Sequence, residues 1–80
     1  MKQNERSVRG LLTRRQQQAL QLRVYGLHYA DIAVRLTIDK ATVSVHLRNA
    51  RRNLSVATIE DAIAIALQRQ LVSPPCAEIG

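Results

Sequence analysis

The stretch KATVSVHLRNARRNL, Lys40 to Leu54, decides how the rest of this 80-residue chain is interpreted. On a helix with about 100° per residue, one apolar stripe is formed by Val43, Leu47, Ala50 and Leu54. The opposite face carries small, apolar and cationic side chains, namely Ala41, Ser44, Val45, Arg48 and Arg52. Between Asp39 and Glu60 there are four Lys or Arg residues and no acid, so the helix cannot neutralise its own charge. A polyanion is the natural complement of this surface.

The composition is that of a small, basic, globular domain. Eighty residues make one domain, which buries only about 60% of its unfolded surface. With 46% hydrophobic and 22% charged residues, the chain is not expected to be disordered. The net charge of +6 favours a nucleic acid as partner. Residues 1–15 carry five basic side chains and one acid, so we expect the basic half to face the ligand.

Nothing in the sequence predicts a membrane protein, a metalloprotein or an enzyme. Residues 1–15 are polar, and no run approaches the roughly 18 apolar residues of a membrane span, so we expect a cytoplasmic protein. Cys76 has no partner for an internal disulfide. Neither His28 nor His46 has a second ligand nearby in sequence, so we expect no metal and no cofactor. Ser44 and His46 point apart on a helix, which excludes a nucleophile and base pair.

Two helices are predicted before residue 40. Thr13-Arg14-Arg15-Gln16 has the spacing of a capping box and starts a helix that runs to about Tyr25, where Gly26 ends it. A shorter helix follows at Tyr29–Leu36 (YADIAVRL). Asp39 is a good N-cap for the helix that begins at Lys40, because its carboxylate accepts from free backbone amides. Two helices joined by three residues, the second long and cationic, form a helix-turn-helix.

A fourth helix is predicted from Ile59 to about Leu71, after the cap-like pattern Thr58-x-x-Asp61. Its apolar residues cover more than one stripe, which suggests a second interface, most simply the same helix of another copy. A broad face turned toward the core is the alternative. The expected homodimer interface consists of Asp61, Ala64, Ile65 and Gln68. Ser73-Pro74-Pro75 is expected to stop the helix before a flexible tail.

From Leu12 to Val72 the chain resembles, without gaps, the LuxR/GerE-type DNA-binding domain. The residues that carry the resemblance are Leu12-Thr13, Arg15, Gly26, Ile32-Ala33, Leu36, Ile38, Thr42-Val43, His46, Asn49, Leu54, Val56, Ala62-Ile63, Ala66 and Leu71-Val72. The resemblance implies an all-α, four-helix fold in which the third helix enters the major groove of double-stranded DNA and the fourth makes a dimer. It also implies a transcriptional regulator whose helix-turn-helix domain spans 12–72. The sequence outside it is read from its composition as a flexible basic arm or poorly ordered leader at 1–11 and a flexible tail at 73–80.

Several positions depart from the family, among them His28-Tyr29-Ala30-Asp31, which replaces a more polar segment. Ser44 stands where the family usually has a lysine that touches DNA, and Gln16 replaces a glutamate. Thr37 replaces a frequent glycine, and a β-branched residue there argues against a left-handed turn. YADIA followed by KATVSVHLRNARRNL also resembles region four of bacterial sigma factors, which would imply contact with RNA polymerase, although residues 55–72 have no counterpart there.

The resemblance and the helix pattern together give a set of expected DNA contacts. Arg48 suits guanine, Val45 suits a thymine methyl, and Ser44 discriminates little between bases. The residues expected at the DNA backbone are Tyr29, Lys40, Thr42, Asn49, Arg51 and Arg52. A module indifferent to DNA, which antagonises a larger LuxR-type regulator by pairing with it, stays open as an alternative.

Overall fold

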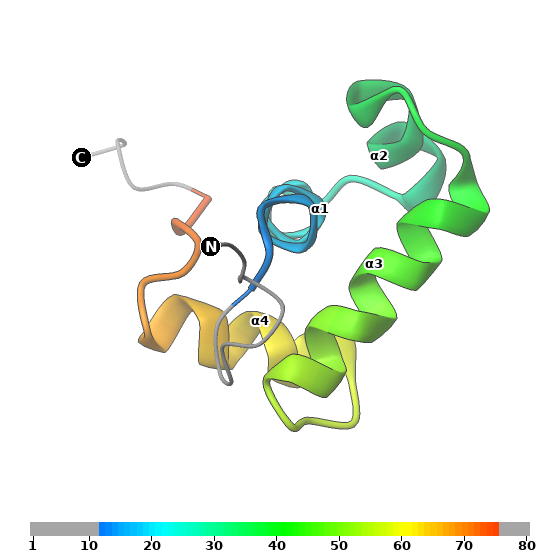
Figure 1. The fold of residues 1–80 in the computed structure, drawn as a ribbon. Helices are drawn as coiled ribbons and strands as arrows, with labels where there is room; N and C mark the ends of the chain where they lie inside the picture. The colour runs from blue at the N-terminus through cyan, green and yellow to red at the C-terminus, as the bar shows by residue number, and fades with distance from the viewer. Residues whose placement is uncertain (1–11, 76–80) are drawn as a thin grey trace, which may run out of the picture.

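The computed structural model describes residues 12–75, and the predicted arm at 1–11 and the end of the tail, 76–80, lie outside this range. The four helices are α1 (Arg14–Val24), α2 (Tyr29–Leu36), α3 (Lys40–Asn53) and α4 (Ile59–Gln68). No strand occurs between residues 12 and 75, so the all-α prediction is confirmed. Figure 1 looks along α1, with α2 and α3 on one side of it and α4 crossing below.

Three of the four helices begin at the predicted capping residues. The Thr13 hydroxyl accepts from the Gln16 amide, and the Thr13 amide donates to Gln16 Oε1, both at 3.2 Å, which completes the capping box. Asp39 Oδ1 accepts from the Thr42 amide at 2.9 Å and from the Thr42 hydroxyl. The hydrogen bond from the Thr42 side chain, followed by that from its backbone, lowers the pKa of the Asp39 carboxyl. Thr58 caps α4 in the same way.

Every helix ends in the same closure, in which a residue with positive φ turns the chain away. These residues are Gly26, Thr37, Ser55 and Gln70, with φ of 93°, 59°, 60° and 62°. The amide of the next residue then donates to a carbonyl five positions earlier: Leu27 to Leu22, Ile38 to Ala33, Val56 to Arg51 and Leu71 to Ala66, at 2.8–3.2 Å. The four donors are apolar and pack against the core, so each closure joins a backbone turn to hydrophobic burial.

Two expectations about these helix ends are wrong. Thr37 was expected to avoid the left-handed region, yet it lies there at φ 59° and ψ 45°. The Ile38 amide bonds Ala33 and the Ile38 side chain packs against the core, and these contacts outweigh a backbone cost of about 1–2 kcal/mol. Helix α4 stops at Gln68 instead of about Leu71, because Gln70 closes it before the prolines are reached.

Helix α3 is the centre of the core and packs on the other three helices. All four residues of its predicted stripe are buried, with at most 5% of Leu54 exposed. The remaining core residues are Ala19, Leu20, Ile32, Ala33, Ala62, Ala66 and Val72. Since one side of α3 is covered by three helices, only its opposite side is left for a partner.

The segment after α4 is fastened to α1 by glutamine side chains. Gln17 Nε2 donates to the Leu71 carbonyl at 2.8 Å. Gln21 makes a reciprocal pair with Ser73, because its Nε2 donates to the Ser73 carbonyl at 2.9 Å while its Oε1 accepts from the Ser73 amide at 2.7 Å. Ser73, at which we expected a flexible tail to begin, is therefore hydrogen-bonded to α1.

Candidate nucleic-acid interface

The outer face of α3 presents the three residues predicted to contact bases. Ser44, Val45 and Arg48 are all exposed, and none of them is turned toward the core. Val45 keeps 39% of its surface exposed although it is a large apolar residue. Ala41 and Arg52 extend the same face by one turn in each direction and are also exposed. A continuous strip of small, apolar and cationic side chains therefore runs along α3.

The cations of this strip have no internal counterion. No hydrogen bond or ion pair ties Arg48 or Arg52 to another residue within 12–75. Helix α3 has no acid in its first turn, and its last turn carries Arg51 and Arg52. The charge of Arg48 and Arg52 therefore stays available to an external anion.

The residues expected at the DNA backbone lie around this strip in different states. Lys40 is exposed, whereas Tyr29, Thr42 and Asn49 are half-buried. Tyr29 packs against the core at the start of α2, so part of its side chain serves the protein's own packing. The Thr42 hydroxyl already donates its hydrogen to Asp39, and a DNA phosphate accepts hydrogen bonds but donates none, so this hydroxyl binds a phosphate only after it turns away from Asp39.

Sequence reasoning missed two polar anchors that hold α3 in place. Arg51 Nη1 donates to the Ala57 carbonyl at 2.8 Å, which ties the end of α3 to the loop before α4. Asn53 Nδ2 donates to Gln16 Oε1 at 2.7 Å, which ties α3 to the capping box of α1. Gln16 is only 8% exposed, and no buried side-chain N or O atom within 12–75 lacks a partner. The glutamine of a capping box is the one signal that pointed to this second contact, because its oxygen has a free lone pair.

The residues expected at a dimer interface lie on the exposed side of α4, in part. Asp61, Ala64 and Gln68 are exposed, while Ile65 is half-buried and packs against the core. Ile59, Ile63 and Leu67 also pack against the core from partly buried positions. Much of the wide apolar face of α4 is therefore used in packing against the protein's own core.

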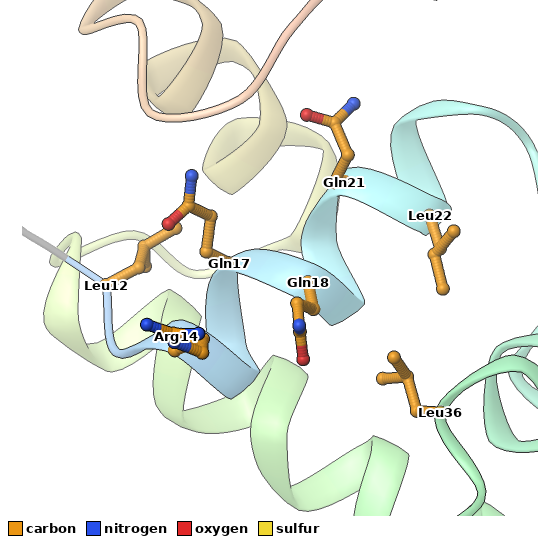
Figure 2. A pocket seen from close by; sticks show the side chains of 7 residues that line it. All are labelled: Leu12, Arg14, Gln17, Gln18, Gln21, Leu22 and Leu36. Carbon is orange, nitrogen blue, oxygen red and sulfur yellow. The ribbon is translucent and has the colours of Figure 1, made fainter.

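A shallow groove lies on the outer side of α1, and none of its lining residues comes from α3. It is lined by Leu12, Arg14, Gln17, Gln18, Gln21, Leu22 and Leu36. Leu22 and Leu36 point toward one another at one end, and Leu12 lies beside Gln17 at the other (Figure 2). Amides and one arginine dominate its middle, so this groove has no constellation for catalysis and is separate from the α3 strip.

The described residues contain no cluster suited to a metal and no helix suited to a bilayer. Within 12–75, His, Cys, Asp and Glu nowhere gather in groups of three or more that could hold an ion. No helix in the same range is long and apolar enough to cross a membrane.

Comparison with known proteins identifies the arrangement. A family model described as "Bacterial regulatory proteins, luxR family" matches residues 10–66. A solved structure titled "Structure of Transcription factor, GerE" is similar, with a TM-score of 0.76 and 34% sequence identity over 81% of this chain and 97% of that chain. No curated protein matches the chain. The resemblance seen in the sequence is thus confirmed: the chain belongs to the LuxR family of bacterial regulatory proteins, whose helix-turn-helix domains bind DNA to regulate transcription.

Proposed function

We propose that this protein regulates transcription by placing α3 in the major groove of a specific DNA site, where Ser44, Val45 and Arg48 contact base edges. The observation that carries the proposal is the exposed face of α3, whose Arg48 and Arg52 have no partner within 12–75. A helix that is buried on one side and cationic on the other fits a groove about 12 Å wide. DNA binding requires the compartment that holds the chromosome, so the proposed location is the cytoplasm.

The side chains of α3 divide by chemistry into base-reading and phosphate-binding groups. The Arg48 guanidinium can bond guanine O6 and N7 together, which is worth about 1–3 kcal/mol of discrimination. Lys40 and Arg52 carry charges without base-specific geometry and suit phosphates. Arg51 gives one N–H to Ala57, and its remaining donors suit a phosphate at the end of the helix.

Two substitutions separate base reading from charge. In fluorescence anisotropy with duplex DNA, Arg48→Ala should reduce the ratio of specific to random affinity by about 10-fold or more. Arg52→Ala should weaken both alike and reduce the salt slope by about one. Arg35→Ala removes the same charge from an exposed position in the last turn of α2, outside the proposed contacts, and serves as the matched control. An Arg48→Ala protein that keeps its full preference would refute the assignment of base reading.

We further propose that two copies join through α4, with contacts at Asp61, Ala64, Ile65 and Gln68. These positions are spaced i, i+3, i+4 and i+7, which makes one seam along the helix. Ala64 is small and exposed and would let two helices approach closely. In an antiparallel pair related by two-fold symmetry, each Asp61 would meet the Gln68 amide of the other copy. The two α3 helices would then occupy successive major grooves, about 34 Å apart.

The test of the dimer uses Ala64→Glu, because Ile65 also packs against its own core and its replacement risks unfolding. Sedimentation equilibrium should give a dimer for the wild type and a monomer for Ala64→Glu, with unchanged helix content by circular dichroism. Gln18→Glu adds the same charge at an exposed position of α1 and should leave the mass unchanged. A wild-type monomer that binds its site one copy at a time would refute the dimer.

Two other functions give different outcomes. Contact with RNA polymerase, as in sigma region four, predicts that polymerase core retains the protein without DNA. The packing of α4 on α3 favours the LuxR-type function over this one, since the sigma segment lacks a counterpart of residues 55–72. An antagonist of a larger LuxR-type regulator predicts no binding to duplex DNA, even at low salt.

A further inference from the structure

Val45 and Arg48 lie close enough on α3 to meet neighbouring base pairs. Three helical residues rise about 4.5 Å along the axis and turn by about 300°, so the two side chains share one face. Neighbouring base pairs of duplex DNA are spaced at about 3.4 Å along the helix axis. Resting on the proposed function, we propose that this pair makes DNA binding depend on the C5-methyl group of a pyrimidine beside a guanine. Thymine and 5-methylcytosine would be accepted, and uracil and unmethylated cytosine would bind more weakly.

The chemistry of Val45 carries the proposal. In the major groove, thymine offers a methyl group and the O4 acceptor, and cytosine offers the N4 donor. Valine has no donor or acceptor, so it contacts the methyl group and does not distinguish O4 from N4. Thymine and 5-methylcytosine share that methyl group. Among residues 12–75, Val45 is the one large apolar side chain of α3 that is exposed, at 39%.

Ser44, the neighbour of Val45, does not oppose either base. Its hydroxyl can donate to O4 of thymine or accept from N4 of cytosine. The lysine that the family usually carries at this position has only donors and would favour acceptors such as O4. The exposed serine therefore leaves the methyl group as the main distinction at this base pair. Arg48 then fixes the register by bonding the adjacent guanine.

The expected effect is small but measurable. Removing one buried methyl group from an apolar contact costs about fourfold in affinity. Two copies on a symmetric site double the contact, and the loss becomes about fifteenfold. Methylation of a cytosine at the same position should raise affinity by the same factors, which would couple this regulator to the methylation state of its site.

The experiment compares four versions of one duplex. The wild-type protein is first used to select a binding site from a library of random DNA duplexes. In the selected duplex, each thymine next to a guanine is then replaced, one base pair at a time. Anisotropy then measures the affinity for thymine, uracil, cytosine and 5-methylcytosine at that position. We expect thymine to exceed uracil, and 5-methylcytosine to exceed cytosine, by about fourfold in each half-site. Val45→Ala should abolish both differences while keeping the preference for guanine.

The outcomes separate this inference from the proposed function. If the wild type binds its selected duplex equally well with thymine or uracil at every such position, the methyl readout is wrong and DNA binding stands. If Val45→Ala stays as sensitive to the methyl group as the wild type, the methyl is read elsewhere and the assignment to Val45 is wrong. If no duplex is bound even at low salt, the proposed function fails as well.

Discussion

Replacing Thr37 by glycine should stabilise the protein, although Thr37 makes the turn of the helix-turn-helix. Its backbone lies at φ 59° and ψ 45°, which costs a residue with a Cβ about 1–2 kcal/mol. Glycine removes that cost, but it loses about 0.5–1 kcal/mol more conformational entropy on folding than a residue with a Cβ. The difference between the two effects is a rise of about 0.5–1 kcal/mol in the free energy of unfolding. For a domain of this size the melting temperature should increase by about 5 °C. Thermal unfolding followed by circular dichroism measures the change.

Two control substitutions make this prediction sharp. Thr37→Ala keeps the Cβ and should recover little of the stabilisation. Gly26→Ala makes the opposite change at φ 93°, where an added Cβ would meet no atom within 4 Å, so any loss of stability there is conformational. If Thr37→Gly melts at or below the wild-type temperature while Gly26→Ala melts unchanged, the reasoning from left-handed backbone is refuted.

Three further substitutions test contacts that hold α3 and the chain's end. Asp39→Asn should flatten the decline in stability as the pH falls below about 4, because the pKa of Asp39 is lowered in the folded protein: the charged cap stabilises fully above the ordinary pKa, and this stabilisation is lost as the pH falls through the folded-state pKa. Asn53→Ala should lower the free energy of unfolding by about 1 kcal/mol, measured in urea, since it removes one of the two hydrogen bonds that the buried Oε1 atom of Gln16 accepts. Gln21→Ala should speed hydrogen exchange at the Ser73 amide, with at most a small change in global stability.

The sequence was sufficient for the helices and their order. Capping residues and a 3.6-residue period are local signals, and they located the starts of α1, α3 and α4 and the buried stripe of α3. The exposure of Ser44, Val45 and Arg48 followed from the same period, since the side opposite a buried stripe faces outward.

The features that the sequence did not predict depend on contacts between distant segments. Thr37 is left-handed because the packing of Ile38 outweighs the local preference of threonine. The bond from Arg51 to Ala57 joins α3 to the following loop, and no periodicity encodes it. The same holds for the pairing of Gln21 with Ser73, 52 residues apart.

A titration of the isotopically labelled protein with duplex DNA, followed by two-dimensional NMR, tests the central claim most directly. The proposed function predicts that the amide signals of Ser44, Val45 and Arg48 shift together on addition of DNA. The signals of Gln18 and Leu22, in the groove on α1, should stay in place. Shifts concentrated on α1 with α3 unaffected, or no shift at any residue at low salt, would contradict the account.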